Sequence, residues 1–400
     1  MKLTVVSDAH LFRTPDSKYW CNTAMHGYLF WKRYLVAFEE VNVVARVKDI
    51  EFKELKENNY IAADGKGVYI KSLPFIRGIK GYALHIRKMS RACKKIADEG
   101  DCAIFRVPSI PAYLFLKEYK KSKRPYAIEV VIDPEDEYSN MPLMKYISVR
   151  ALKKVCMNAN GVSYVTQHYL QNKYPSSYSQ DNYNKNYFES YYSSIDLKRD
   201  FFYFDRTYKE KIEKFNIIHI ANSINNENKG HHVLLKIISK LKELNIIANV
   251  TFIGYGDLID KFISEAKELG ISNQVQFIGY VSSKTEIRNY LISSDIFIFP
   301  TRAEGLPRAL IEAMATGLPC LSSKVDGIPE LLDDEYLFSP DDIDGYVKKI
   351  VELKVNPQKM KEMGKNNIEK AMEYESERLS ERRFVFYNKL RTIVEENRKM

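Results

Sequence analysis

The sequence predicts an α/β fold with two domains, each built on a parallel sheet that helices cover on both faces. Three observations support this prediction. Short apolar runs of strand type alternate with helical patterns in both halves of the chain. The length of 400 residues favours two domains over one. A stretch rich in Tyr, Asn and Ser, residues 174–208, lacks periodicity and separates the two halves as a linker.

Six apolar runs in the first half have the character of buried strands. Between the third and fourth of them, residues 81–99 form a helical pattern through Leu84, Met89, Ala92 and Ile96. The expected strands are residues 3–6, 41–47, 68–73, 102–107, 127–133 and 161–166.

The second half restarts the alternation at residue 216. The run 248–257 ends in a Gly-x-Gly turn without the third glycine of a dinucleotide fingerprint, which argues against an NAD site. Helical patterns run through residues 233–241, 284–293, 359–373 and 377–399. The expected strands are residues 216–221, 248–257, 275–281, 296–299 and 319–322.

Composition indicates a cytoplasmic protein. The net charge of +9, from 61 basic and 52 acidic residues, suits phosphorylated ligands or an anionic membrane face and is too diffuse to indicate nucleic-acid binding. No segment has the pattern of a signal peptide or a membrane span, so any membrane contact is expected to be peripheral. The five cysteines lack CxxC spacing, so we expect reduced thiols and neither zinc nor disulfides: Cys21, Cys93, Cys102, Cys156 and Cys320.

Two carboxylates frame the start of one predicted helix. Glu304 lies in the loop before it and Glu312 lies inside it, about 12 Å further along at 1.5 Å per residue. Pro307 suits the first helical position, and free N–H groups at Gly305 and Leu306 would face an anion. Such a helix could bind a ribose, a diphosphate and a sugar along its length. The alternative is a surface helix with one solvated and one capping glutamate.

The run from Glu304 to Pro319, EGLPRALIEAMATGLP, is followed by DGIPE at residues 326–330. This signature closely resembles the family-4 retaining glycosyltransferases, and weaker similarity extends over most of the chain. The resemblance implies the GT-B architecture, in which two Rossmann-like domains face each other across a cleft. It places an acceptor-side domain at residues 1–205 and a donor-binding domain at 206–379. A C-terminal helix of about 380–400 would pack back on the first domain.

The resemblance also implies a reaction. A sugar would pass from a nucleotide diphosphate sugar to a hydroxyl of a glycan or lipid-linked acceptor, in bacterial surface polysaccharide synthesis. Lys229 and Glu304 would be the catalytic residues, with Lys229 neutralising the leaving diphosphate and Glu304 orienting the sugar. Gly305, Leu306, Pro307 and Glu312 would complete this part of the donor site. No metal and no cofactor are expected.

Further donor contacts follow from the same resemblance. The turn with Gly254 and Gly256 would lie against the nucleotide, and Tyr280 and Val281 would meet the base. Members of the family usually carry an Arg six residues before the Lys, where this chain has Ser223. Arg302 and Arg308 are the cations that could replace it: both flank the helix start.

Acceptor-side residues are expected at strand ends of the first half. They are Arg106 and Asp133, together with His26 in the segment that follows the first strand. Many relatives carry a His near the strand 127–133; this chain has none there, and Glu129 or Asp133 would take its place. A structural role is the alternative for His26. The acidic loop 133–137 does not have the spacing of a calcium loop, so no metal is expected there.

Basic residues gather in two clusters of the first half, within residues 87–95 and 117–124. Solvated helix faces are one interpretation, and contact with an anionic inner membrane leaflet is the other. The main alternative for the whole chain is a non-catalytic subunit that binds nucleotide sugars for another transferase. A GT-B epimerase or phosphorylase is a third class, without support from the residues.

Overall fold

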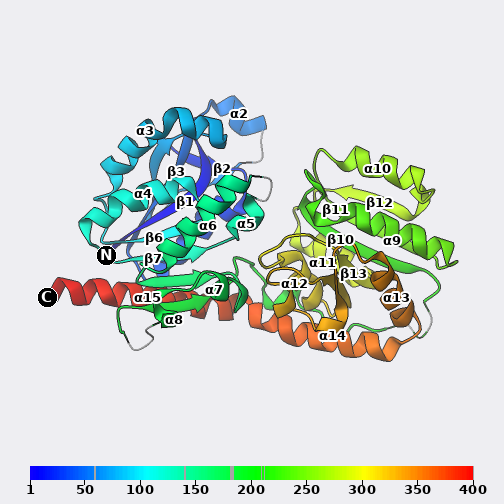
Figure 1. Cartoon of the computed structure of the whole chain (residues 1–400). Coiled ribbons are helices and arrows are strands. Elements are labelled where there is room, and N and C mark those ends of the chain that lie inside the picture. The colour runs from blue at the N-terminus through cyan, green and yellow to red at the C-terminus, as the bar shows by residue number, and fades with distance from the viewer. Residues whose placement is uncertain (58–59, 139–140, 181–183, 209, 211, 400) are drawn as a thin grey trace. The chain divides into compact units, whose positions relative to one another are not determined.

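The computed structural model divides the chain into two compact units (Figure 1). It describes residues 1–57, 60–138, 141–180, 184–208, 210 and 212–399. The first unit comprises Met1–Ser194 and Ser380–Met400, and the second comprises Ile195–Leu379. Each unit has its own sheet and its own hydrophobic core.

The first unit is built on a nine-stranded sheet. Its strands are β1 (Lys2–Arg13), β2 (Tyr19–Cys21), β3 (Glu40–Asp49), β4 (Ile61–Ala62), β5 (Val68–Pro74), β6 (Cys102–Val107), β7 (Tyr126–Val130), β8 (Gly161–Tyr164) and β9 (Phe188–Tyr191). Seven of them run parallel in the order β5-β3-β1-β6-β7-β8-β9, with β2 and β4 added antiparallel at the end of β1. The strand order reverses at β1, as in doubly wound sheets.

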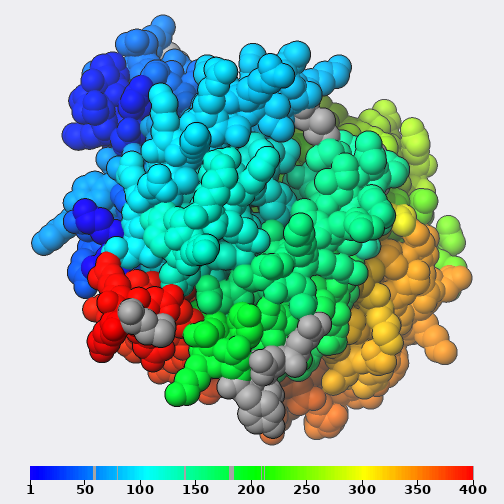
Figure 2. Space-filling view, turned by 60° about the vertical axis from the view of Figure 1, so that its left-hand side comes forward, coloured from blue at the N-terminus to red at the C-terminus, as the bar shows by residue number. Residues whose placement is uncertain are grey.

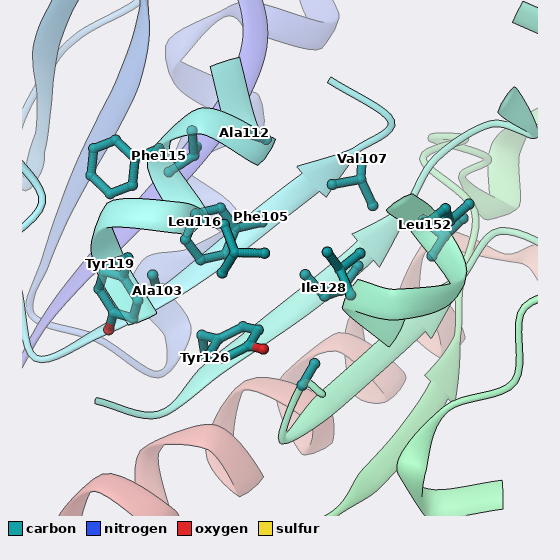
Figure 3. Close-up of a cluster of buried hydrophobic side chains, with 14 of the residues drawn as sticks. Ala103, Phe105, Val107, Ala112, Phe115, Leu116, Tyr119, Tyr126, Ile128 and Leu152 are labelled. Atoms are coloured by element: carbon teal, nitrogen blue, oxygen red, sulfur yellow. The ribbon is translucent and has the colours of Figure 1, made fainter. Parts of the chain in front are cut away.

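Three long helices and one sheet face form the main core of the first unit. Its helices are α1 (Tyr28–Lys32), α2 (Phe52–Glu57), α3 (Gly78–Ile96), α4 (Ile110–Tyr119), α5 (Pro134–Glu137), α6 (Pro142–Cys156), α7 (Tyr169–Lys173) and α8 (Ser177–Gln180). Phe105 and Ile128 on the sheet pack with Phe115 and Leu116 of α4 and Leu152 of α6 (Figure 3). Burial of each such side chain stabilises the fold by about 1.5–3 kcal/mol.

The second unit is built on six parallel strands. These are β10 (Phe215–Ser223), β11 (Ala248–Tyr255), β12 (Val275–Gly279), β13 (Ile296–Phe299), β14 (Cys320–Ser323) and β15 (Leu337–Phe338). Their order is β12-β11-β10-β13-β14-β15. The chain moves outward from β10 to β12 and then returns to β13 on the other side of β10. In open α/β sheets, ligands bind beyond the carboxyl ends of the two strands where the order reverses, here β10 and β13.

Helices connect the strands of the second unit. They are α9 (His231–Glu243), α10 (Ile259–Glu268), α11 (Lys284–Ser293), α12 (Arg308–Ala315), α13 (Ile343–Lys354) and α14 (Pro357–Ala371). The final helix, α15 (Ser376–Lys399), starts in the second unit and belongs to the first unit from Ser380 onward. Within the first unit its Tyr387 donates to Glu129, and its Arg391 donates to the carbonyl of Ala37.

Several elements differ from the sequence expectation. β1 extends to Arg13, well beyond residue 6, because its pairing with β3 resumes at His10 after an irregularity and continues to Arg13. Part of the expected linker 174–208 forms β9, where Phe188 packs against Phe386 with ring centroids 4.9 Å apart; residues 181–183 of that linker lie outside the described residues. Pro307 is the N-cap of α12 and precedes its first helical residue.

The division between the units lies at Ser194, before the expected boundary at residue 205. Residues that follow Ser194 are bound to the second unit by hydrogen bonds. The guanidinium of Arg206 donates to the carbonyls of Thr316, Ser294 and Leu291 at 2.7–2.8 Å. Such contacts are not readable from a stretch without periodicity.

Two histidines are fully buried in the second unit. His219 on β10 and His231 on α9 have ring centroids 4.5 Å apart, and Phe252 and Phe262 pack around His231. His219 Nδ1 lies 2.9 Å from the carbonyl oxygen of Ile298. Neither ring nitrogen of His231 has a hydrogen-bond partner in the described part of the chain. Burial lowers the pKa of His219 to about 4 and the pKa of His231 to about 2.

These pKa values make the second unit sensitive to acid. Below about pH 6.5 these histidines become protonated in the unfolded chain but stay neutral in the folded chain. Their contribution to the free energy of unfolding is therefore fully present above that pH and falls as the pH drops towards 4. Each histidine contributes a slope of about 1.4 kcal/mol per pH unit. His231→Leu should therefore have a shallower dependence of unfolding free energy on pH, measured by denaturant titration. His85→Gln, on exposed α3, should keep the wild-type slope; equal slopes in all three proteins would contradict the assignment.

Candidate active site

A cation and a carboxylate meet at the point where the strand order of the second unit reverses. Lys229 ends a short 3-10 turn, Glu227–Lys229, that follows β10. Glu304 lies in the loop that follows β13. Their side chains form an ion pair between Lys229 Nζ and Glu304 Oε2, and each is about a quarter exposed (27% and 25%). The sheet order thus brings together the two residues expected to be catalytic.

The loop that carries Lys229 is held against the loop after β13. The carbonyl of Asn228 accepts hydrogen bonds from Thr301 Oγ1 at 2.9 Å and from the Arg302 N–H at 2.8 Å. Gly230 has a φ of +75°, and a Cβ there would lie 2.1 Å from the carbonyl oxygen of Pro300. Only glycine combines this dihedral angle with this close approach. The position of Lys229 therefore depends on the glycine that follows it.

Glu304 is positioned through its backbone. Its N–H donates to Asp326 Oδ2 at 2.8 Å, so the DGIPE segment holds the Glu304 loop in place. Asp326 itself has a φ of +49°, a rare conformation for a residue with a Cβ. The loop after β13 is further fixed by Ser323 Oγ, which donates to the carbonyl of Thr301. The DGIPE segment thus has a structural role next to the candidate catalytic residues.

The start of α12 offers backbone donors beside Glu304. Pro307 makes no side-chain capping hydrogen bond, and no acidic residue lies in the first turn. The N–H groups of the first turn and the positive end of the helix dipole suit an anion. Gly305 and Leu306, expected to be the donors, are buried in the loop just before the helix.

Glu312 lies on the second turn of α12 and is half-buried. Burial raises the pKa of its carboxyl, while the positive charges of Arg308 and Lys284 oppose that shift. It makes no ion pair within 4.0 Å among the residues that the structure describes. Its carboxylate is therefore available to a ligand.

The expected nucleotide contacts follow β11 and β12. Gly254 has a φ of +147°, and a Cβ there would lie 1.8 Å from the carbonyl oxygen of Ala221, so this turn lies against the end of β10. Tyr255 and Tyr280 are 59% and 63% exposed, with ring centroids 5.7 Å apart in an edge-to-face pair. Exposed aromatic pairs offer a surface for a nucleobase. Gly256 and Val281 flank these tyrosines in the sequence.

Ser223, in place of the usual Arg, is exposed at the end of β10. Arg302 is a poor substitute because its guanidinium makes two hydrogen bonds to the carboxylate of Asp341, one of them 2.8 Å long. Arg308 is exposed at the first position of α12. Lys229 is held at this site by its ion pair with Glu304.

Asp133 and His26, expected on the acceptor side, have structural surroundings. Asp133 is fully buried, caps α5 through the Glu135 N–H at 2.9 Å, and accepts from Lys173 at 2.7 Å and Tyr174 at 2.6 Å. His26 is half-buried, and burial followed by the charge of Arg106 lowers its pKa to about 4. A neutral His26 is therefore expected at neutral pH.

Arg106 lies in a pocket of about 300 Å³ in the first unit, near the carboxyl ends of β6, β7 and β8. It donates to Glu129, which is 3% exposed. Sequence reasoning missed most of this pocket, because its residues are far apart in the chain and share no motif. The lining residues are Met25, Arg33, Arg106, Glu129, Val130, Val131, Ile132, Ser163, Tyr164, Val165, Tyr192, Ser193 and Ser194.

In the described part of the chain, no three His, Cys, Asp or Glu side chains are grouped as metal ligands. None of the helices formed by these residues is both long enough and apolar enough to span a lipid bilayer.

Comparison with known proteins shows that the chain is similar to glycosyltransferases. The family model described as glycosyl transferases group 1 matches residues 204–370. Protein CapJ of Staphylococcus aureus is 27% identical over 362 residues, which cover 86% of this chain and 84% of CapJ. The amylovoran biosynthesis glycosyltransferase AmsK of Erwinia amylovora is 37% identical over 113 residues, 27% of this chain and 28% of AmsK.

The fold also matches a solved structure. HepE from Anabaena, in complex with UDP and glucose, has a TM-score of 0.63 at 15% identity, with 100% of both chains covered. The chain therefore has the GT-B fold with two Rossmann-like units, and it is a glycosyltransferase.

The contact between Gly230 and Pro300 can be tested with a matched pair of substitutions. Gly230→Ala should lower the free energy of unfolding by about 1–3 kcal/mol more than Gly270→Ala, measured by denaturant titration. Both glycines have positive φ, +75° and +67°, but a Cβ at Gly270 would meet only Lys242 Nζ at 3.8 Å. Equal destabilisation would mean that the loop accommodates a Cβ near Pro300.

Proposed function

We propose that the chain is a retaining glycosyltransferase of family 4. It would move a sugar from a nucleotide diphosphate sugar to a hydroxyl of a glycan or lipid-linked acceptor. The observation that carries the proposal is the Lys229–Glu304 pair at the reversal of strand order, beside the uncapped start of α12. A cation and a helix N-terminus suit a diphosphate, and a carboxylate suits sugar hydroxyls.

The donor would lie along α12 and the strand ends beside it. Lys229 exchanges its bond to Glu304 for one to the diphosphate, which leaves the Glu304 carboxylate for sugar hydroxyls. Glu312 accepts hydrogen bonds from the ribose. Tyr280, together with Tyr255, contacts the base. HepE was solved with UDP and glucose, which supports a uridine diphosphate sugar as the class of donor.

In the reaction, the bond between the anomeric carbon and the diphosphate oxygen breaks, and a bond to the acceptor oxygen forms. The acceptor proton passes to the released diphosphate. Negative charge grows on the diphosphate as the bond breaks, and Lys229 and the first-turn N–H groups of α12 stabilise that charge. Retention requires the acceptor to approach from the face that the diphosphate leaves. AmsK, named for amylovoran biosynthesis, supports a role in bacterial surface polysaccharide synthesis.

A lipid-linked acceptor would place the enzyme at a membrane, and the first unit has a surface suited to that. Helix α3 carries six basic residues and α6 carries four, and neither carries an acidic one. Since the chain has a net charge of +9, the rest of it sums to −1. Both helices lie in the face shown in cyan and green in Figure 2. Exposed Leu84 on α3 and exposed Leu143, Tyr146 and Ile147 on α6 add apolar contacts.

Substitution of the ion pair tests the function. Glu304→Ala and Lys229→Ala should each lower turnover by on the order of a hundredfold, as for loss of one preorganised charge contact. Turnover is measured as nucleoside diphosphate released from a panel of nucleotide sugars with acceptor glycans. Lys240→Ala breaks an exposed ion pair with Asp344 and should leave turnover unchanged. Wild-type turnover in both site variants refutes the assignment, and donor binding without product indicates the non-catalytic subunit instead.

Membrane binding is tested by cosedimentation with vesicles. The wild-type chain should bind vesicles with anionic lipid more tightly than neutral ones. At about 1 kcal/mol per basic residue, replacing Lys88, Arg91 and Lys153 by Glu should weaken that binding by at least about a hundredfold. The matched control reverses Lys236 and Lys267, exposed lysines of the second unit, and should bind as wild type. Equal and negligible binding to both kinds of vesicle eliminates the membrane contact.

A further inference from the structure

The pocket of the first unit lies at the carboxyl edge of its parallel sheet. Arg106 comes from β6, and Glu129 and Val130 come from the end of β7. The lining continues past the end of β8 and includes Ser193 and Ser194, which follow β9. This edge is where doubly wound sheets bind ligands. All lining residues belong to the first unit.

Glu129, at the base of the pocket, is saturated with hydrogen bonds. Its Oε2 accepts from Tyr34 at 2.9 Å, from Arg33 at 3.3 Å and from Arg106. Its Oε1 accepts from Tyr192 at 3.0 Å and from Tyr387 at 3.2 Å. A carboxylate with five donors has no free lone pair with which to bind a ligand or take a proton.

Arg106 has donors to spare. Its bond to Glu129 is its one hydrogen bond in the described part of the chain, although a guanidinium carries five N–H groups. The side chain is 11% exposed, and its remaining N–H groups are not among the enclosed polar atoms without a partner. The guanidinium stands over the ring of Phe30 at 4.7 Å, and that of Arg33 stands over the same ring at 3.8 Å. Arg106 is therefore rigidly placed with unused donors at the pocket surface.

The charges at this site do not balance. Arg33 and Arg106 bring two positive charges, and Glu129 brings one negative charge. Burial, and then repulsion by the nearby Arg33, lower the pKa of Arg383 on α15. A cluster built only to hold the fold together would be neutral, since burying surplus charge is costly. The surplus positive charge next to an open pocket favours an anionic ligand.

The other walls suit a sugar ring. Val131, Ile132 and Val165 form apolar surface, and Ser163 and Ser194 bring hydroxyl groups. A volume of about 300 Å³ is at the small end of ligand pockets and fits one ring with a substituent.

We propose that this pocket binds an acidic sugar of the acceptor, with Arg106 as the ligand of its carboxylate or phosphate group. The inference rests on the proposed function, because it names the acceptor of that reaction. Acceptors whose sugars are all neutral would leave the Arg106 guanidinium without a partner. The enzyme would then discriminate against them, because a donor left unpaired in a desolvated site costs binding free energy.

Binding of small probes to the full chain tests this assignment. The probes are D-glucuronate, glucose 1-phosphate and glucose, followed by ligand-observed NMR titration. At least one of the two anions should bind about tenfold or more tightly than glucose, as expected for a charge-assisted contact. Glucuronate alone points to a uronic acid, and glucose 1-phosphate alone points to a phosphorylated sugar or a lipid-linked sugar phosphate. The proposal is overturned if glucose binds as tightly as both anions, or if none of the three probes binds.

Variants connect the binding to Arg106. Arg106→Gln should abolish the preference for the anion, and Arg106→Lys, which keeps the charge opposite Glu129, should retain part of it. If Arg106→Gln fails to fold, Arg106→Lys is the test, and a preference for the anion weaker than that of wild type supports the assignment. Arg378→Gln, an exposed arginine of α15, is the matched control and should bind as wild type. Wild-type preference in both Arg106 variants rejects the assignment.

The donor site provides an independent readout. UDP should raise the melting temperature of wild type and of both Arg106 variants equally, because the proposed donor residues lie in the second unit. If no nucleotide or nucleotide sugar stabilises the wild-type chain, the proposed function fails. If UDP stabilises it and the anions bind no better than glucose, the acceptor inference alone fails.

Discussion

The contact between Lys229 and Glu304 depends on the order of strands in the second sheet. The two residues are far apart in the chain, and they meet because β10 and β13 are neighbours whose carboxyl ends lie at one edge. Two backbone devices then set the distance between their loops. One is the absence of a Cβ at Gly230, and the other is the hydrogen bond that the Glu304 N–H donates to Asp326. Chemistry at this edge thus follows from topology and from two local backbone contacts.

The two units use the same sheet architecture for different electrostatic purposes. In the second unit, the cation of Lys229 and a helix start lie where the strand order reverses. In the first unit, two arginines are ordered by one saturated carboxylate and by the ring of Phe30. One arrangement suits a leaving group whose charge grows, and the other suits a fixed anion. The proposed donor and acceptor sites lie in separate units, so each could be tuned alone.

Sequence reasoning succeeded where the signal is local. The strand at 296–299 and the helix at 284–293 have the expected bounds, because a short apolar run and a capping Ser283 mark them. Lys229 and Glu304 were expected from two separate short motifs, the Lys-Gly pair after the first strand of the second half and the run that begins at Glu304; their ion pair is seen only in the structure, and their roles stay a prediction. The Glu129 cluster was out of reach, because its partners come from residues 33 to 387 and meet only through the tertiary fold. The same holds for β9, whose sequence has no strand periodicity.

Helix α15 has a consequence for synthesis on the ribosome. Its Tyr387 completes the shell around Glu129, and its Arg391 binds the carbonyl of Ala37, yet residues 195–379 are translated before either. At about 5–20 residues per second, the nascent first unit waits roughly 10–40 s for this helix. During that time Glu129 lacks one of its donors and the surface that α15 covers is open. The second unit can fold in the interval. The unit that is translated later is therefore the first whose residues have all been synthesised.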